Sequence, residues 1–202
     1  MRPERPDAGA VATLSVVSAA EMEALGRRLG ALLRRGDLVI LSGELGAGKT
    51  TLTRGIGEGM GVRGPVTSPT FVLSRVHPPV AAGHDVPLVH VDAYRLGSAR
   101  ELDDLDLDFE GAAVVVEWGD GLLDDVADSW LRIRIDRERS GPASGSGGGA
   151  LEAVRGGAAA ESASSPEADD GDGLRRVAVQ AHGPAWTAER LASVVPDAEE
   201  RA

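Results

Sequence analysis

Apolar residues recur along this chain of 202 residues at two spacings, one typical of helices and the other typical of strands. Helical spacing predicts one helix after a capping box at 18–21 and a second helix that begins at Thr50. Their apolar faces consist of Met22, Leu25, Leu29 and Leu32 in the first helix and of Leu52, Ile56 and Met60 in the second. Glycines at 55, 57 and 59 interrupt the second helix, where they indicate either close packing or a frayed end.

Short apolar runs and alternating apolar residues predict the strands. The predicted strands cover residues 11–17, 38–41, 71–76, 88–92, 113–118, 131–136 and 177–181. Uniformly apolar runs such as 38–41 are typical of buried parallel strands, whereas the last two strands alternate like an antiparallel pair with one exposed face. With short helices over 98–105 and 186–195, this order predicts an α/β fold. Its sheet has mostly parallel strands flanked by helices and ends in an antiparallel strand pair.

Two stretches differ in composition from the rest of the chain. Residues 138–173 are rich in Gly, Ser, Ala and Glu and hold few large apolar side chains, which is typical of a disordered, low-complexity insertion. A regulated docking segment is the alternative interpretation. Residues 1–10 are rich in Pro, Arg and Ala and are also predicted to be disordered. We therefore expect a single domain over 11–202 that carries the insertion as a loop.

The bulk composition argues against several classes of protein. The net charge of -11 disfavours strong direct binding of RNA or DNA by this chain alone. The absence of cysteine excludes disulfides, thiol catalysis and cysteine-bound zinc. No apolar run approaches the roughly 20 residues of a membrane span. Polar residues interrupt the stretch 8–20 and acidic residues precede it, so we expect a cytoplasmic protein without a signal peptide.

The clearest chemical motif is the sequence Gly-Glu-Leu-Gly-Ala-Gly-Lys-Thr at 43–50, between a predicted strand and a predicted helix. In such a P-loop, glycines let backbone amides face the phosphates, the lysine reaches the β- and γ-phosphates, and the hydroxyl binds Mg²⁺. Lys49 is the only lysine among 21 basic residues, which indicates that this position needs an ammonium group rather than a guanidinium. The motif predicts a P-loop NTPase-like fold that binds a nucleoside triphosphate.

A P-loop enzyme also needs a carboxylate at the end of a neighbouring strand, to hold the metal or its water. Two predicted strands end in acidic residues, one in Glu117 and the other in Asp92. Asp92 would hold a metal-bound water, orient the attacking water or cap a turn. His90 is compatible with a structural or a functional role, and the segment 67–70 with a γ-phosphate sensor or a plain turn.

Four motifs in this order resemble the TsaE (YjeE) family, the ATPase of bacterial tRNA threonylcarbamoyladenosine synthesis. They are the P-loop at 43–51, Ser-Pro-Thr-Phe at 68–71, His-Val-Asp-Ala-Tyr-Arg-Leu at 90–96 and Val-Glu-Trp at 116–118. The similarity covers about residues 14–136 and resumes near Arg175. The long insertion departs from the family pattern, and this leaves open whether the tip of the last hairpin contributes to binding.

The resemblance implies an ATP site whose phosphates lie against Leu45, Gly46, Ala47, Gly48, Lys49, Thr50 and Thr51. Thr50 and Glu117 would hold Mg²⁺, while Asp92, Glu117 and Lys49 would be the catalytic residues. By position, Ala19 and Asp120 would lie near the nucleotide.

The resemblance also implies two protein partners, TsaB and TsaD. ATP hydrolysis would reset their complex between rounds of threonylcarbamoyl transfer to the tRNA adenosine beside the anticodon. The acidic chain would then contact tRNA mainly through these partners.

Three other functions are compatible with a P-loop. A GTPase is disfavoured, because its guanine-recognition motif needs a second lysine, which this chain lacks. A small-molecule kinase would need an arginine-bearing lid, and no insertion here has the apolar content of one. A non-hydrolysing nucleotide-binding scaffold would release no phosphate even with both partners present.

The composition of the insertion yields a first prediction. Deletion of residues 140–171 should leave the melting temperature and the affinity for ATP nearly unchanged, because the segment has too few apolar side chains to contribute to the core. Thermal unfolding and nucleotide titration of the shortened and full-length chains check this. A large loss of either quantity would show that the insertion is structural.

Overall fold

The computed structural model describes residues 11–80, 85–123, 126–138 and 173–195. The predictions of disorder for 1–10 and for nearly all of 138–173 fall outside these residues. In chain order the elements are β1 (Val11–Val16), α1 (Ala19–Gly30), β2 (Leu38–Ser42), α2 (Lys49–Met60), β3 (Ser74–His77), β4 (Leu88–Asp92), α3 (Ala99–Asp103), β5 (Ala113–Glu117), β6 (Trp130–Arg137), β7 (Arg175–His182) and α4 (Ala188–Val194). Within the described ranges, no helix is long and apolar enough to cross a membrane.

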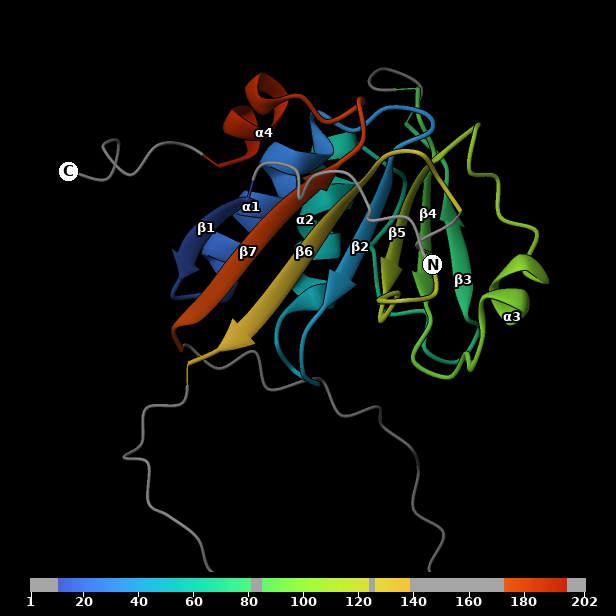
Figure 1. The fold of residues 1–202 in the computed structure, drawn as a ribbon, viewed down its shortest axis with the longest axis horizontal. Helices are drawn as coiled ribbons and strands as arrows, with labels where there is room; N and C mark the ends of the chain where they lie inside the picture. Colours follow the sequence, from blue (N-terminus) through green and yellow to red (C-terminus); the bar gives the residue numbers. More distant parts are fainter. Residues whose placement is uncertain (1–10, 81–84, 124–125, 139–172, 196–202) are drawn as a thin grey trace, which may run out of the picture.

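All seven strands form one mixed sheet in the order β1-β7-β6-β2-β5-β4-β3 (Figure 1). The centre is parallel: β2 pairs with both β5 and β6, and β4 pairs with β5. Strand β7 runs antiparallel to β6, with Ile135 opposite Val177, and β1 and β3 close the two edges in antiparallel pairs. The predicted α/β fold and its terminal antiparallel strand pair are confirmed.

The strand predicted over 71–76 begins later than its apolar residues indicate. The amides of Val72 and Leu73 both donate to the carbonyl oxygen of Pro69, at 2.9 and 2.8 Å, and so form a turn. Leu73 has a left-handed φ of 65°, and β3 begins only at Ser74. Phe71 and Val72 are exposed in this turn rather than paired in the sheet.

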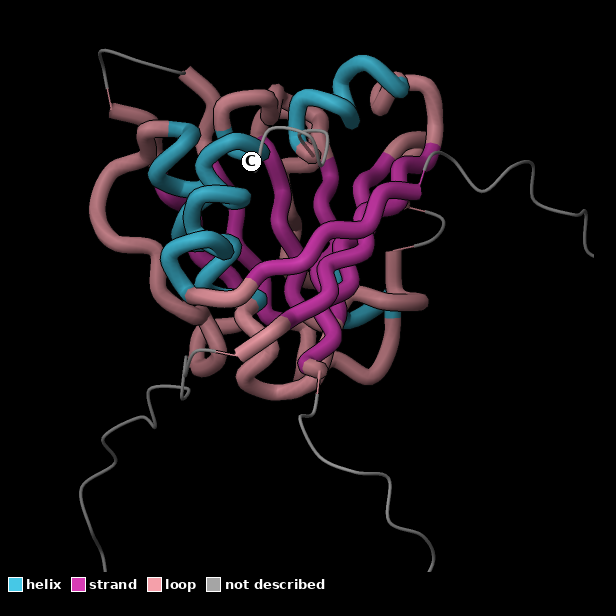
Figure 2. Tube along the Cα trace, turned by 90° about the vertical axis from the view of Figure 1, so that its left-hand side faces the viewer, coloured by secondary structure: helices cyan, strands magenta, loops and turns pink. Residues whose placement is uncertain are grey.

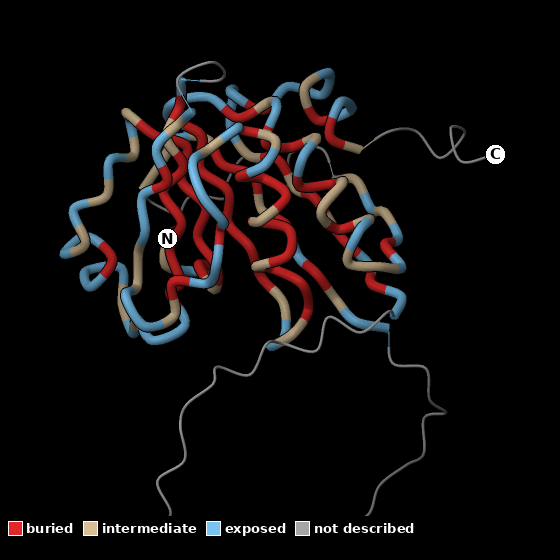
Figure 3. The backbone as a smooth tube through the Cα atoms, turned by 180° about the vertical axis from the view of Figure 1, so that it is seen from behind, coloured by how far each residue is buried: buried red, intermediate tan, exposed pale blue. Residues whose placement is uncertain are grey.

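Each face of the sheet has its own apolar core. One core joins the sheet to α1, α2 and α4, and the other packs beneath α3 and the loops near it. Figure 2 shows the sheet nearly edge-on with helices stacked against one side. In Figure 3 the buried residues follow the central strands and the helix faces that meet them. The parallel strands β2, β4 and β5 are buried along their whole length, as uniformly apolar runs predict.

Helices α1 and α2 approach each other through glycines. A Cβ atom on Gly26 would lie 2.3 Å from the carbonyl oxygen of Leu52, and one on Gly30 would lie 2.2 Å from that of Ile56. From the other side, a Cβ on Gly55 would lie 2.2 Å from the carbonyl oxygen of Glu23. The glycines of the second helix therefore serve close packing, which decides between the two interpretations left open by the sequence.

This packing predicts that Gly55→Ala destabilises the protein. Alanine favours a helix by about 1 kcal/mol over glycine, but its Cβ would meet three backbone atoms of Glu23 within 3 Å and force the two helices apart, at a cost of about 3 kcal/mol or more. Urea unfolding of the nucleotide-free protein should show a net loss of stability. Glu58→Ala, at an exposed position of the same helix, is the control, since it removes only an exposed ion pair with Arg27. Equal or greater stability of Gly55→Ala would contradict the close approach.

Candidate functional site

The P-loop connects the buried strand β2 to the start of α2. Three of its glycines adopt positive φ angles that other residues rarely tolerate: Gly43 at 143°, Gly46 at 72° and Gly48 at 110°. Gly48 is the N-cap of α2 and forms no side-chain capping bond. The positive end of the helix dipole therefore opens directly into the loop, as an anion site requires.

Lys49 folds back across the loop. Its Nζ donates to the carbonyl oxygens of Gly43 at 2.8 Å and Glu44 at 2.9 Å, and lies 3.6 Å from the ring centroid of Trp118. Burial lowers the pKa of the Lys49 ammonium below its ordinary value, although the carboxylates of Glu117 and Asp92 counteract this effect. The only lysine of the chain thus sits at the mouth of the loop beside two carboxylates.

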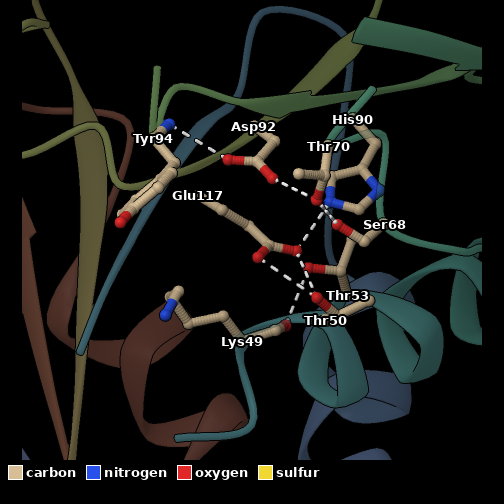
Figure 4. A network of polar contacts seen from close by, with 9 residues as sticks. All are labelled: Lys49, Thr50, Thr53, Ser68, Thr70, His90, Asp92, Tyr94 and Glu117. Atoms are coloured by element: carbon tan, nitrogen blue, oxygen red, sulfur yellow. Dashed lines mark hydrogen bonds and ion pairs between the residues drawn. The ribbon is translucent and has the colours of Figure 1, made fainter. Parts of the chain in front are cut away.

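Glu117 ends β5 and lies directly beside the start of α2. Its Oε1 and Oε2 accept from the Thr50 hydroxyl at 2.9 and 3.2 Å, and its Oε1 lies 2.8 Å from Nε2 of His90 (Figure 4). The Glu117 side chain is buried, so its charge needs such partners. A carboxylate and a hydroxyl in contact form the kind of oxygen donor pair that Mg²⁺ prefers, and this pair fits the predicted metal site.

Asp92 ends the neighbouring strand β4 and is the register partner of Glu117. Its Oδ2 accepts from the Thr70 hydroxyl at 2.7 Å, its Oδ1 accepts from the amide of Tyr94 at 3.0 Å, and the hydroxyls of Thr70 and Ser68 lie 2.6 Å apart. The structure therefore joins the Ser-Pro-Thr segment to a carboxylate of the site (Figure 4). The two predicted carboxylates lie side by side at the carboxyl ends of parallel strands, where ligands bind in open α/β sheets.

His90 is fully buried and takes part in the site. Its Nε2 lies 2.8 Å from Oε1 of Glu117, and its Nδ1 is buried with no hydrogen-bond partner among the described residues. Burial is the main cause of the lowered pKa of the nearby His77, and the neighbouring His90 and Arg75 lower it further. The structure thus assigns His90 a contact with Glu117, a role that the sequence left undecided.

The remaining predicted residues lie around the loop in different settings. Leu45 is exposed at the tip of the loop, and Thr51 is buried in the first turn of α2. Ser18 caps α1 by accepting from the amide of Glu21 at 3.2 Å, so Ala19 is the first residue of that helix. Asp120 lies 3.1 Å from Nε of Arg132 in an ion pair. The predicted nucleotide contacts of Ala19, Thr51 and Asp120 stay predictions.

Two contacts of the site were not predicted from the sequence. Trp118, with a left-handed φ of 63°, lies with its ring over Lys49 and 5.1 Å from the ring of Tyr94. Arg175, at the start of β7, donates from Nε to the carbonyl oxygen of Ala47 in the P-loop at 3.1 Å. The Glu-Trp sequence was a usable signal for the first contact, but no local pattern connects Arg175 with a loop that precedes it by more than a hundred residues.

Comparisons with known proteins identify the family of this chain. The sequence profile of a family described as threonylcarbamoyl adenosine biosynthesis protein TsaE matches residues 16–143. A Streptomyces coelicolor protein named tRNA threonylcarbamoyladenosine biosynthesis protein TsaE is 64% identical over 119 residues, which are 57% of this chain and 79% of the relative. A Mycobacterium bovis protein of the same name is 51% identical over 137 residues, which are 64% of this chain and 80% of that one.

The fold is similar to that in the crystal structure of Bacillus subtilis YdiB. The TM-score is 0.57 at 24% sequence identity, and the match covers 92% of this chain and 94% of the YdiB chain. The family profile spans the P-loop, both carboxylates, His90 and Trp118. The chain therefore belongs to the TsaE family of threonylcarbamoyladenosine biosynthesis proteins.

Proposed function

We propose that this protein is a magnesium-dependent ATPase that supports threonylcarbamoyladenosine modification of the tRNA adenosine beside the anticodon. The observation that carries the proposal is the contact between the P-loop hydroxyl of Thr50 and the buried carboxylate of Glu117, at 2.9 Å. A hydroxyl at the end of a P-loop, paired with a strand-end carboxylate, is the arrangement that holds the nucleotide-bound Mg²⁺ in P-loop NTPases. The names of the relatives supply the pathway.

Each residue of the site has a separate role in this proposal. Mg²⁺ would neutralise charge between the β- and γ-phosphates when bound. Thr50 and Glu117 would hold the metal, and Lys49 would exchange its carbonyl partners for phosphate oxygens. Asp92 would orient the attacking water. The Thr70 hydroxyl already bonds to Asp92. The Ser-Pro-Thr segment would therefore change its contacts when the terminal phosphate beside Asp92 is bound or lost.

The second carboxylate favours hydrolysis over binding alone. A scaffold that only held a nucleotide would need Lys49, Thr50 and Glu117, but not a second buried acid in register with Glu117. The missing second lysine continues to disfavour GTP. Phosphate release with and without the partner proteins distinguishes the ATPase from the scaffold, and transfer to a small-molecule acceptor would reveal a kinase.

The proposal includes the TsaB and TsaD proteins as partners in the cytoplasm, with tRNA bound mainly through them. The net charge of -11 supports this division, since the chain offers little electrostatic attraction to a nucleic acid. A pull-down from the native cytosol with ATP and then with ADP would test it. Recovery of neither partner in either state would contradict the proposed complex.

Lys49→Ala should abolish measurable ATP binding. The variant loses a charge-assisted bond to phosphate worth about 3 kcal/mol, which corresponds to a loss of affinity of about 100-fold or more. Nucleotide titration and phosphate release with and without the TsaB–TsaD pair check this. Lys49→Arg keeps the charge but not the compact ammonium, and it should also bind weakly. Normal stimulated hydrolysis by Lys49→Ala would refute the assigned phosphate site.

Glu117→Ala should weaken magnesium-dependent turnover while the protein still folds. Without the carboxylate, Thr50 alone would hold the metal, so the Mg²⁺ concentration for half-maximal phosphate release should rise by about tenfold or more. Nucleotide affinity without Mg²⁺ should change much less. Glu138→Ala, which removes an exposed carboxylate paired with Arg176, is the control and should titrate with Mg²⁺ like the unmodified protein. An unchanged Mg²⁺ dependence of Glu117→Ala would remove Glu117 from the metal site.

A further inference from the structure

The P-loop rests against the end of the β6–β7 strand pair. A Cβ atom on Gly43 would lie 2.3 Å from the carbonyl oxygen of Ile135 in β6, so the loop begins in direct contact with that strand. Further along, a Cβ on Gly46 would lie 3.5 Å from Nη1 of Arg137, the last residue of β6. Arg137 is the register partner of Arg175, the first residue of β7. The outer wall of the loop is therefore formed by the end of this strand pair.

Arg175 makes the most direct of these contacts. The residue is only 3% exposed, and its guanidinium donates from Nε to the carbonyl oxygen of Ala47 at 3.1 Å and from Nη1 to that of Gly173 at 2.9 Å. A buried guanidinium is costly unless its donors are satisfied, so its position is closely defined. The planar group thus links the P-loop to the start of β7.

The contact at Ala47 fixes the direction of a second group. In a planar trans peptide the carbonyl oxygen and the following amide hydrogen point in opposite directions. With the oxygen of Ala47 held against Arg175, the amide of Gly48 must point away from Arg175. This amide is one of those that face phosphate oxygens in a P-loop.

The glycine end of the Ala47–Gly48 peptide does not by itself fix the orientation of the peptide. A flip of this peptide changes ψ of Ala47 and φ of Gly48, and glycine tolerates positive and negative φ almost equally. Gly48 has a φ of 110°. Because glycine has no Cβ atom, sterics alone do not hold it at this angle. A side-chain bond to the carbonyl is therefore an effective means of keeping the amide directed inward before the nucleotide binds.

We propose that Arg175 is a positioning residue that holds the Ala47–Gly48 peptide with its amide directed into the phosphate site. The inference rests on the proposed nucleotide site and adds a residue that lies outside the P-loop motif. A purely structural Arg175 would fasten the start of β7 and affect only stability. If Arg175 is a positioning residue, its removal makes the loop less ordered in the nucleotide-free protein. It also lowers the affinity for the β-phosphate, which ATP and ADP share.

The test compares Arg175→Gln with Arg176→Gln. Arg176 is the matched control, because it is the adjacent arginine of the same strand but is exposed and paired with Glu138. The affinities for ATP and ADP are measured by titration well below the melting temperature. Hydrogen exchange of the 44–50 amides is measured without nucleotide. We expect Arg175→Gln to weaken both nucleotides by about tenfold and to speed exchange in the loop, and Arg176→Gln to do neither.

Unchanged affinity and exchange in a folded Arg175→Gln protein would overturn the proposal, as would equal effects of Arg176→Gln. If Arg175→Gln does not fold, Arg175→Lys decides the question by the same measurements. It keeps the charge without the planar fork, so intermediate affinity supports the proposal and unaltered affinity refutes it. If Lys49→Ala binds ATP normally, the proposed function fails on its own. The exchange measurement still decides the inference then: faster exchange supports it and unchanged exchange refutes it.

Discussion

The buried carboxylate of Glu117 connects the elements on which the site depends. It ends β5, accepts from Thr50 at the start of α2, and contacts His90 in β4. A buried charge without these partners would be strongly destabilising, so the strand ends and the helix start are held in one arrangement. The same contacts hold the Glu117 oxygens beside the P-loop.

The position of α2 is constrained by the P-loop that precedes it and by the helix that packs against it. Its first turn emerges from the P-loop, and its body lies against α1 at glycine positions where no side chain separates the two backbones. Such contacts leave little freedom for the helix to shift, because interiors are close-packed and resist small displacements. The orientation of the loop amides is therefore determined partly by α1, which carries none of the proposed catalytic groups.

Local patterns in the sequence predict much of this structure, and contacts between distant segments account for most of the rest. The P-loop, the paired acids Asp92 and Glu117, and the β6–β7 pairing depend on short motifs or on period-two alternation, which sequence reveals directly. The start of β3 was misplaced, because Phe71 and Val72 are apolar yet belong to a turn closed by Pro69. Strand propensity says nothing about such turn bonds.

The role of His90 and the contact of Arg175 could not be predicted, for a different reason. His90 contacts a side chain of the neighbouring strand, and Arg175 contacts a backbone carbonyl of the P-loop that lies 128 residues away in the chain. The spacing of residues in one sequence cannot predict a contact between segments so far apart. The sheet order, in which β6 lies next to β2, brings the start of β7 close to the loop that follows β2.

The uniqueness of Lys49 has a further consequence for chemical labelling. The chain contains a single ε-amino group, and it lies in the P-loop with a lowered pKa, so its neutral, nucleophilic fraction is larger than that of an ordinary lysine. Any acylation of a lysine side chain in this protein is therefore a modification of Lys49, in the proposed phosphate site. Lys49 is only 5% exposed, so the rate of its acylation measures how accessible this site is to the reagent.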